Sequence, residues 1–271
     1  MTRRLAAFAV AVTVTAVTLS CRAIPAPTNG VLSLSTVQLP SPGVAVGDTL
    51  RDSTGRAAPL RVYAFGVGGE TDTIQGAAAT TQFVVLDRGA SVTSDGYVIG
   101  DSARATPVRI IGSVGTLQTS VANLAVTPRP DSIGPTGATT IATINFAATD
   151  TTARSAALGA TVLATGVVPA AGVQAVIVRY AIVSAPPGFN DAVTGILLNA
   201  AGRPATVDTT DASGHVSPTI RLRPAALAAP SVPDSFVVTA SASYAGVPLR
   251  GSPVRFVVPI QTKAPSGSRI H

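Results

Sequence analysis

Residues 234–258, DSFVVTASASYAGVPLRGSPVRFVV, are the stretch that decides the fold class of this chain. In its first half, Phe236, Val238 and Ala240 lie two positions apart, and Ser and Thr dominate the positions between them. Because successive side chains of a β-strand point to opposite faces of a sheet, this alternation predicts a strand with one buried face. Residues 254–260 repeat the pattern after a segment rich in Gly and Pro. The stretch therefore predicts two neighbouring strands of an all-β fold.

The composition of the whole chain also favours strands and turns over helices. Its 271 residues include 25 Gly and 21 Pro, and hydrophobic residues make up 46% while aromatic residues make up only 4%. β-Branched side chains suit strands, and Gly and Pro suit turns. The length allows two modest domains and a targeting segment, because domains cluster near ~100–150 residues. We therefore expect β-sandwich cores built from small and β-branched side chains.

Two parts of the chain resemble known bacterial domains. Residues 39–50 (LPSPGVAVGDTL), 94–100 (SDGYVIG) and 108–128 (VRIIGSVGTLQTSVANLAVTP) resemble bacterial immunoglobulin-like domains. Residues 209–224 (TTDASGHVSPTIRLRP), followed by 234–258, resemble the invasin and intimin type of these domains. The resemblance implies two tandem immunoglobulin-like antiparallel β-sandwiches, which we place at residues 30–127 and 128–262. Residues 263–271 are expected to form a disordered tail.

The N-terminus predicts export. Thr2, Arg3 and Arg4 form a short positive segment, and the apolar run at residues 5–17 is shorter than the ~20 residues that span a bilayer. Residues 1–20 are therefore expected to be a signal peptide, with a Pro-containing tether at residues 21–29.

The signal peptide ends in Thr18-Leu19-Ser20-Cys21, which resembles the lipobox of bacterial lipoproteins, although that family usually has Leu where this chain has Thr18. The resemblance implies that Cys21 is lipidated and anchors the protein to the cell envelope, at the outer membrane. The alternative is cleavage a little further on, which would give a secreted or periplasmic protein.

The positive charge does not by itself indicate a nucleic-acid partner. The formal net charge is +6, but Lys263 is the only lysine and the arginines fall singly after the pair Arg3-Arg4. Proteins that follow a phosphate backbone cluster their cations or interleave them with aromatic residues. We therefore expect scattered, solvated arginines and no nucleic-acid binding.

The stretch VDTTDASGHV at residues 207–216 contains two carboxylates, a serine and a histidine. Asp211 and Gly214 stand at the first and fourth positions of a type I turn, where Asp accepts backbone N–H bonds and Gly tolerates positive φ. A catalytic serine needs a base, an orienting acid and oxyanion donors, and no Gly-x-Ser-x-Gly motif supports Ser213 and His215. The stretch predicts a structural turn and no catalytic residues.

No pattern indicates a metal ion or a cofactor. His215 and His271 are the only histidines, and there is no His-Glu-x-x-His, Walker or Gly-x-Gly-x-x-Gly sequence. Asp208 and Asp211 could offer oxygens to calcium, but their spacing is not that of an EF-hand loop. We expect no metal site and no cofactor.

A loop after the apolar run at residues 172–183 is a possible contact site. It contains Phe189, Asn190 and Asp191, and an exposed Phe189 would be a plausible contact residue. The alternative is that Phe189 folds back and covers the end of the sandwich.

These features together predict a non-catalytic, lipid-anchored cell-envelope protein that acts as a surface spacer or an adhesion module. Its expected partners are a membrane, through the lipid, and an unknown protein or glycan at the cell surface. The main alternative is a carbohydrate-binding accessory module, although the chain has no Trp and only four Tyr for stacking on sugars. A third class, a hydrolase that uses Ser213 and His215, is disfavoured by the turn interpretation.

Overall fold

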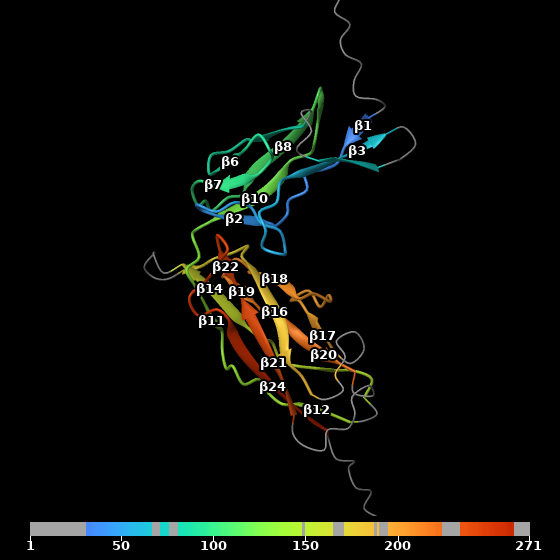
Figure 1. Cartoon of the computed structure of the whole chain (residues 1–271), viewed down its shortest axis with the longest axis vertical. Helices are drawn as coiled ribbons and strands as arrows, with labels where there is room; N and C mark the ends of the chain where they lie inside the picture. The colour runs from blue at the N-terminus through green and yellow to red at the C-terminus, as the bar shows by residue number, and fades with distance from the viewer. Residues whose placement is uncertain are drawn as a thin grey trace, which may run out of the picture.

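The computed structural model describes residues 31–66, 71–75, 81–147, 150–164, 171–186, 189, 195–223 and 234–262. Within these residues every regular element is a β-strand. The strands form two bodies that follow one another along the longest axis of the molecule (Figure 1). The predicted all-β fold with two tandem β-sandwiches is confirmed. The signal peptide, the tether and the tail lie outside the described residues.

The N-terminal sandwich consists of strands β1 to β10. One sheet has the order β2-β10-β8-β5 with β9 beside β8, a second has the order β1-β3-β4, and β6 and β7 form a hairpin. The strands are β1 (Val31–Leu34), β2 (Gly43–Ala45), β3 (Arg61–Gly66), β4 (Thr71–Gln75), β5 (Thr81–Val85), β6 (Ala90–Val92), β7 (Val98–Gly100), β8 (Val108–Val114), β9 (Leu117–Gln118) and β10 (Ala122–Thr127).

The C-terminal sandwich consists of strands β11 to β24. Its main sheet has the order β12-β24-β21-β16-β18, and two smaller sheets have the orders β11-β14-β15, with β19 beside β14, and β13-β20-β17. The strands are β11 (Ser132–Pro135), β12 (Ile144–Phe146), β13 (Ala153–Arg154), β14 (Ala160–Ala164), β15 (Ala171–Gly172), β16 (Ile177–Ser184), β17 (Gly195–Leu198), β18 (Val207–Thr209), β19 (His215–Val216), β20 (Thr219–Leu222), β21 (Asp234–Ser241), β22 (Ser243–Tyr244), β23 (Val247–Pro248) and β24 (Val254–Thr262).

Each sandwich has its own hydrophobic core. The buried cluster of the N-terminal sandwich contains only Val, Leu, Ile and Ala, among them Leu50, Leu60 and Ile110. The cluster of the C-terminal sandwich is larger and adds Phe236 and Phe256, both fully buried. The cores are thus built mainly from small and β-branched side chains, as the composition predicts.

The stretch that decided the fold class forms the longest uninterrupted strand pairing of the described residues. β21 and β24 pair antiparallel from Asp234 opposite Ile260 to Ala240 opposite Val254. The alternation in β21 has the predicted effect, since Phe236, Val238 and Ala240 are fully buried. The core of the C-terminal sandwich is therefore organised around this pair.

In each sandwich, the last strand also has a parallel neighbour. β10 pairs with β2, with Ala125 opposite Gly43, and β24 pairs with β12, with Ile260 opposite Ile144. An early strand and the final strand of each sandwich thus lie side by side and run in the same direction.

Several predicted strands differ from the observed ones at their ends. The predicted strand at Val108–Val114 is confirmed in full as β8, whereas residues 216–222 are divided into β19 and β20 by Pro218, which has no N–H to donate. The apolar run at residues 172–183 is shorter as a strand, because β16 begins at Ile177, and Val183 is 58% exposed. The segment RPAALAAPS at residues 223–231, whose prolines leave room for one helical turn at most, lies almost entirely outside the described residues.

Candidate functional site

One five-residue turn occurs four times in the described residues. In each copy the fourth residue is Gly with positive φ, its N–H donates to the carbonyl oxygen of the first residue, and the first residue donates to the carbonyl oxygen of the fifth. In each copy a side-chain oxygen of the first residue also accepts the N–H of the fifth residue. This is a type I turn followed by a left-handed Gly. The four copies are Asp52 to Arg56, Thr93 to Tyr97, Asn199 to Arg203 and Asp211 to His215.

The stretch that contains Ser213 and His215 is one of these turns. Oδ1 of Asp211 accepts the N–H of Ser213 at 2.8 Å and that of His215 at 2.9 Å, and Gly214 has a φ of 78°. These backbone N–H bonds, that of His215 foremost, lower the pKa of Asp211. The Asp211 carboxylate thus stabilises the turn, and in the described part of the chain no hydrogen bond joins Ser213 to His215. The arrangement is not that of a catalytic triad.

This turn connects two sheets and not two strands of one sheet. β18, before it, pairs with β16, whereas β19, after it, pairs with β14. Thr210 fixes the crossing, since its buried hydroxyl donates to the carbonyl of Val173 at 2.6 Å and accepts the N–H of Val176 at 2.9 Å. The turn therefore closes one end of the C-terminal sandwich core.

The possible contact loop is described only at Phe189. The Phe189 ring lies edge-on against the buried Phe236 ring, with 5.0 Å between the ring centroids. Phe189 thus covers the core, and it also borders an open groove of about 1120 Å³ between β16 and β17. Asn190 and Asp191 lie outside the described residues, so contact with a partner at this loop stays a prediction.

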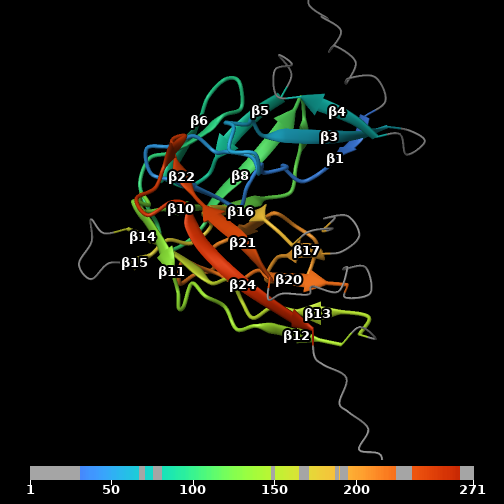
Figure 2. The same cartoon turned by 60° about the horizontal axis from the view of Figure 1, so that its bottom comes forward.

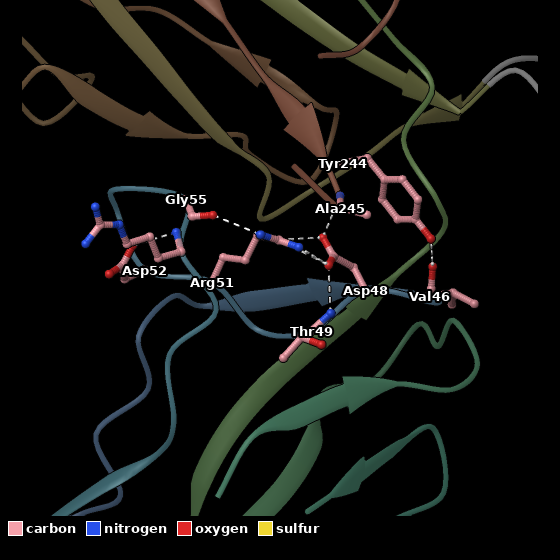
Figure 3. A network of polar contacts seen from close by, with 9 residues as sticks. Val46, Asp48, Thr49, Arg51, Asp52, Gly55, Tyr244 and Ala245 are labelled. Atoms are coloured by element: carbon pink, nitrogen blue, oxygen red, sulfur yellow. Dashed lines mark hydrogen bonds and ion pairs between the residues drawn. The ribbon is translucent and has the colours of Figure 1, made fainter. Parts of the chain in front are cut away.

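The most extensive polar network of the described residues lies where the two sandwiches meet (Figure 3). Asp48, in the loop after β2, accepts hydrogen bonds through both carboxylate oxygens. Arg51 donates to it through Nε and Nη2 at 2.9 to 3.1 Å, and Thr49 donates its backbone N–H at 2.7 Å. From the C-terminal sandwich, Ala245 donates its backbone N–H to Oδ2 at 3.0 Å. The side chains of Asp48 and Arg51 are only 10% and 24% exposed, so this ion pair is partly shielded from solvent.

Two further contacts connect the sandwiches beside Asp48. The hydroxyl of Tyr244 donates to the carbonyl oxygen of Val46 at 2.8 Å (Figure 3). Nε of Arg179, on β16, donates to the carbonyl oxygen of Ser53 at 3.1 Å. We call Val46, Asp48 and Ser53, together with their partners Arg179, Tyr244 and Ala245, the junction network.

The linker between the sandwiches is short and stiff. Residues 128–131 read Pro-Arg-Pro-Asp, and each proline fixes its own φ and restricts the residue before it to extended conformations. The guanidinium of Arg129 lies 4.7 Å from the centroid of the Tyr244 ring, which is cation–π geometry. The linker is thus attached to the same tyrosine that contacts Val46.

At the junction between the two sandwiches, the backbones approach each other closely and two residues have strained conformations. Ala175 and Ala245 have φ values of 59° and 49°, and in the described residues they are the only non-glycine residues with positive φ. A Cβ on Gly43 would lie 2.5 Å from the Cβ of Ala175, and one on Gly47 would lie 2.8 Å from the Tyr244 hydroxyl. A left-handed alanine costs about 1–2 kcal/mol, and such residues persist only where the surrounding contacts determine them. The junction therefore contains both left-handed alanines of the described backbone together with two close approaches of glycine backbone to the other sandwich.

A cavity of about 250 Å³ lies at the junction and is lined by residues of both sandwiches, among them Ser41, Thr127, Ile177 and Ser252. Its charged residues are Asp48, Arg51, Asp52 and Arg179, two acidic and two basic, and Asp48 and Arg51 form an ion pair. Nowhere in the described residues do three or more His, Cys, Asp or Glu side chains gather as they would around a metal ion. The described residues also contain no helix that is long and apolar enough to cross a membrane.

Comparison with known proteins gives structural likeness only. No protein-family model matches the chain, and no curated protein matches its sequence. Among solved structures, it is similar to the S-layer protein rSbsC(31-844), at 12% identity and a TM-score of 0.30, over 88% of this chain and 28% of that one. It is similar to the Yersinia pseudotuberculosis adhesin InvE, at 11% identity and a TM-score of 0.33, over 83% of this chain and 58% of that one.

The N-terminal eight immunoglobulin domains of the Down Syndrome Cell Adhesion Molecule are also similar, at 10% identity and a TM-score of 0.24, over 86% of this chain and 24% of that one. The chain therefore covers less than two thirds of each of these structures. By their names they are surface-layer and adhesion proteins. At such identities and TM-scores, neither a partner nor an activity follows from the likeness.

Proposed function

We propose that this chain is an exported, non-catalytic cell-envelope protein that acts as a rigid two-sandwich spacer or adhesion module. The junction network is the observation that carries this proposal. Domains that share a chain reorient by default unless the contacts between them are extensive or specific. Here, side chains and backbone groups of both sandwiches are joined by hydrogen bonds around Asp48, and a short Pro-containing linker crosses the same place. Such a joint would hold an outer binding surface at a fixed direction from its attachment point.

The proposed attachment is a lipid on Cys21, at the outer membrane. It is supported by the lipobox-like sequence at Thr18-Leu19-Ser20-Cys21 after an apolar segment. Domain bounds at residues 30–127 and 128–262 are part of the same proposal, and a secreted or periplasmic protein is the alternative.

The anchoring is tested by labelling cells with palmitate and by measuring the intact mass of the mature protein. We expect label in the wild-type chain and a mass that starts at acylated Cys21. Cys21→Ser should remain unlabelled and should leave the membrane fraction. An unmodified mature chain that starts beyond Cys21 would support the secreted alternative.

The rigid joint is tested by measuring how the two sandwiches tumble, with residual dipolar couplings of the chain from residue 30 onwards. We expect one shared alignment tensor in the wild type. The double variant Asp48→Ala with Tyr244→Phe should show two different tensors, because it loses the Ala245 and Val46 contacts. The matched control is Asp101→Ala with Tyr97→Phe, away from the junction. Independent tensors in the wild type would rule out the rigid spacer.

A further inference from the structure

Three arginines lie together at the outer face of the sheet β13-β20-β17. Arg221 and Arg223 are two positions apart in the sequence, and Arg154 comes from a distant segment. β13 and β20 pair antiparallel, and this register places Arg154 directly opposite Arg221. Ile220 and Leu222 are fully buried, so Arg221 lies on the opposite, outer side of β20. Arg223 follows directly after the strand and is exposed. Figure 2 shows β13 and β20 side by side at the edge of the C-terminal sandwich. We call Arg154, Arg221 and Arg223 the arginine patch.

Among the described residues, no carboxylate balances the positive charge of this patch. Residues directly opposite across an antiparallel pair have Cβ atoms about 4.5–5.5 Å apart, and like charges there are destabilising. No carboxylate of the described residues forms an ion pair or hydrogen bond with any of the three arginines. The acid nearest to Arg154 in the described sequence, Asp150, uses Oδ2 to accept the N–H of Ala147 at 2.8 Å. The repulsion between Arg154 and Arg221 therefore costs stability, and no interaction of the described residues offsets it.

The patch has the chemistry of an anion site. A guanidinium presents a planar fork of N–H donors that fits a carboxylate, sulfate or phosphate group in bidentate fashion. Alternate residues of an extended chain are about 6.6–6.8 Å apart, and Arg223 follows Arg221 at this spacing in the sequence, just beyond the end of β20. Arg154 lies opposite Arg221. Neighbouring charges of one linear polyanion can therefore be bound together. Ser217 and Thr219 precede the arginines at alternate positions and offer hydroxyl groups.

The surroundings of the patch favour an acidic glycan over other polyanions. β13, β17 and β20 contain no aromatic residue on which a nucleic-acid base could stack. Three arginines are fewer than the four to eight basic residues, roughly, that mark sites for anionic lipid surfaces. Protein interfaces depend on buried aromatic or apolar anchors. The outer positions of β20 carry Thr and Arg, and the apolar residue beside Arg221 on β17, Ile196, is half-buried.

We propose that the arginine patch binds a linear acidic polysaccharide, whose carboxylate groups are held by the three guanidinium groups. This site is independent of the rigid joint between the sandwiches. It also gives a specific form to the carbohydrate-binding alternative, since recognition would depend on charge and not on stacking against Trp or Tyr.

The test is a calorimetric titration of the chain from residue 30 onwards with oligogalacturonate, a carboxylate polymer, and with a neutral oligosaccharide of the same length. We expect binding of oligogalacturonate alone, weakened by added salt. Arg154→Gln, Arg221→Gln and Arg223→Gln should each weaken binding about tenfold, and the triple variant should abolish it. The control triple variant, Arg56→Gln, Arg61→Gln and Arg88→Gln, removes the same charge from the N-terminal sandwich and should bind within about twofold of the wild type.

Three outcomes would overturn the proposal. The first is that the wild type fails to bind oligogalacturonate, and the second is that the patch variant binds it as tightly as the wild type does. The third is tighter binding of single-stranded DNA, or of vesicles containing anionic lipid, through the same three arginines. Thermal unfolding distinguishes loss of the site from loss of the fold. Because the arginines repel each other, replacing them should leave the unfolding temperature unchanged or raise it. A lowered unfolding temperature would show that the arginines support the fold instead.

Discussion

Asp48 accepts the backbone N–H of Ala245 at 3.0 Å, although the two residues are 197 positions apart in the chain. Ala245 stands in the left-handed region with a φ of 49°, a conformation that Ala rarely adopts. The same carboxylate is held by Arg51 within its own loop. The orientation of the C-terminal sandwich is thus determined by a carboxylate that the N-terminal sandwich has already positioned.

Removal of the Asp48 carboxylate should destabilise the protein. Asp48→Ala deprives Arg51, Thr49 and Ala245 of their acceptor and leaves a partly buried guanidinium without its partner. We expect a loss of about 2–3 kcal/mol in the free energy of unfolding, measured by urea denaturation. Asp101→Ala, at an exposed position, should change it by about 0.5 kcal/mol or less. Equal effects of the two substitutions would contradict the role given to Asp48.

Relief of the strain at Ala245 should stabilise the protein. Ala245→Gly keeps the N–H that donates to Asp48 and removes the Cβ that disfavours positive φ. We expect a gain of about 0.5–1 kcal/mol, because the strain of about 1–2 kcal/mol is partly offset by the greater entropy of Gly in the unfolded chain. Ala201→Gly, at an exposed turn position without positive φ, should instead lose stability. A loss at Ala245 as well would mean that its Cβ contributes packing that outweighs the strain.

Two glycines of the recurrent turn allow conformational strain to be separated from steric overlap. Gly202 and Gly214 have φ values of 73° and 78°, so an added Cβ meets the same backbone penalty at both. At Gly202 nothing lies within 4 Å of that Cβ, whereas at Gly214 it would lie 2.6 Å from the carbonyl oxygen of Val162. We expect Gly202→Ala to cost about 1 kcal/mol and Gly214→Ala about 3 kcal/mol or more. Chemical denaturation measures the free energy of unfolding of both variants. Similar losses in the two would disprove the steric overlap with Val162.

Stability should fall in acid partly through Asp87. The side chain of Arg109 donates to both oxygens of Asp87 at 3.0 Å and holds the pKa of Asp87 at about 2, below its ordinary value of 3.8. A carboxyl whose pKa is depressed in the folded state contributes its full stability above the unfolded value, and loses it as the pH falls through the folded value. The contribution of Asp87 should therefore disappear between about pH 4 and pH 2.

Asp87→Asn should make the free energy of unfolding depend less on pH within this window. It should not remove the dependence, because hydrogen bonds from Thr54 lower the pKa of Asp52, and the backbone of His215 lowers that of Asp211. Urea unfolding at a series of pH values measures the effect, with Asp101→Asn as the control. If the slope of the free energy of unfolding against pH is the same for Asp87→Asn as for the wild type, the ion pair with Arg109 is too well solvated to contribute to stability.

Local patterns in the sequence were sufficient to predict some of the strands and one of the turns. Alternating apolar residues predicted β21 and β24, because burial of one face of a strand follows a period of two. The Asp211 turn could be predicted because its chemistry lies within five residues. The other copies of the turn carry the same signal, a residue with a side-chain oxygen followed three positions later by Gly, and could have been found by it.

The features that the sequence concealed all depend on contacts between distant residues. Gly43 begins β2, where its missing side chain allows the backbone to approach Ala175 of the other sandwich. The expectation that the arginines are scattered is wrong for Arg154 and Arg221, which the pairing of β13 with β20 brings together. No periodicity within one segment encodes such a register.

The parallel pairs β2–β10 and β12–β24 determine how the chain responds to mechanical tension. In each sandwich the second strand and the last strand lie side by side and point the same way. Once the first strand, β1 or β11, has detached, a force that pulls the two ends of the sandwich apart slides these two strands along each other, so it acts in shear on all the hydrogen bonds of the pair at once. If one end of the chain is anchored and the other end is held by a partner, tension loads the parallel pair of each sandwich in shear. The hydrogen bonds of that pair would then have to break together and not one after another.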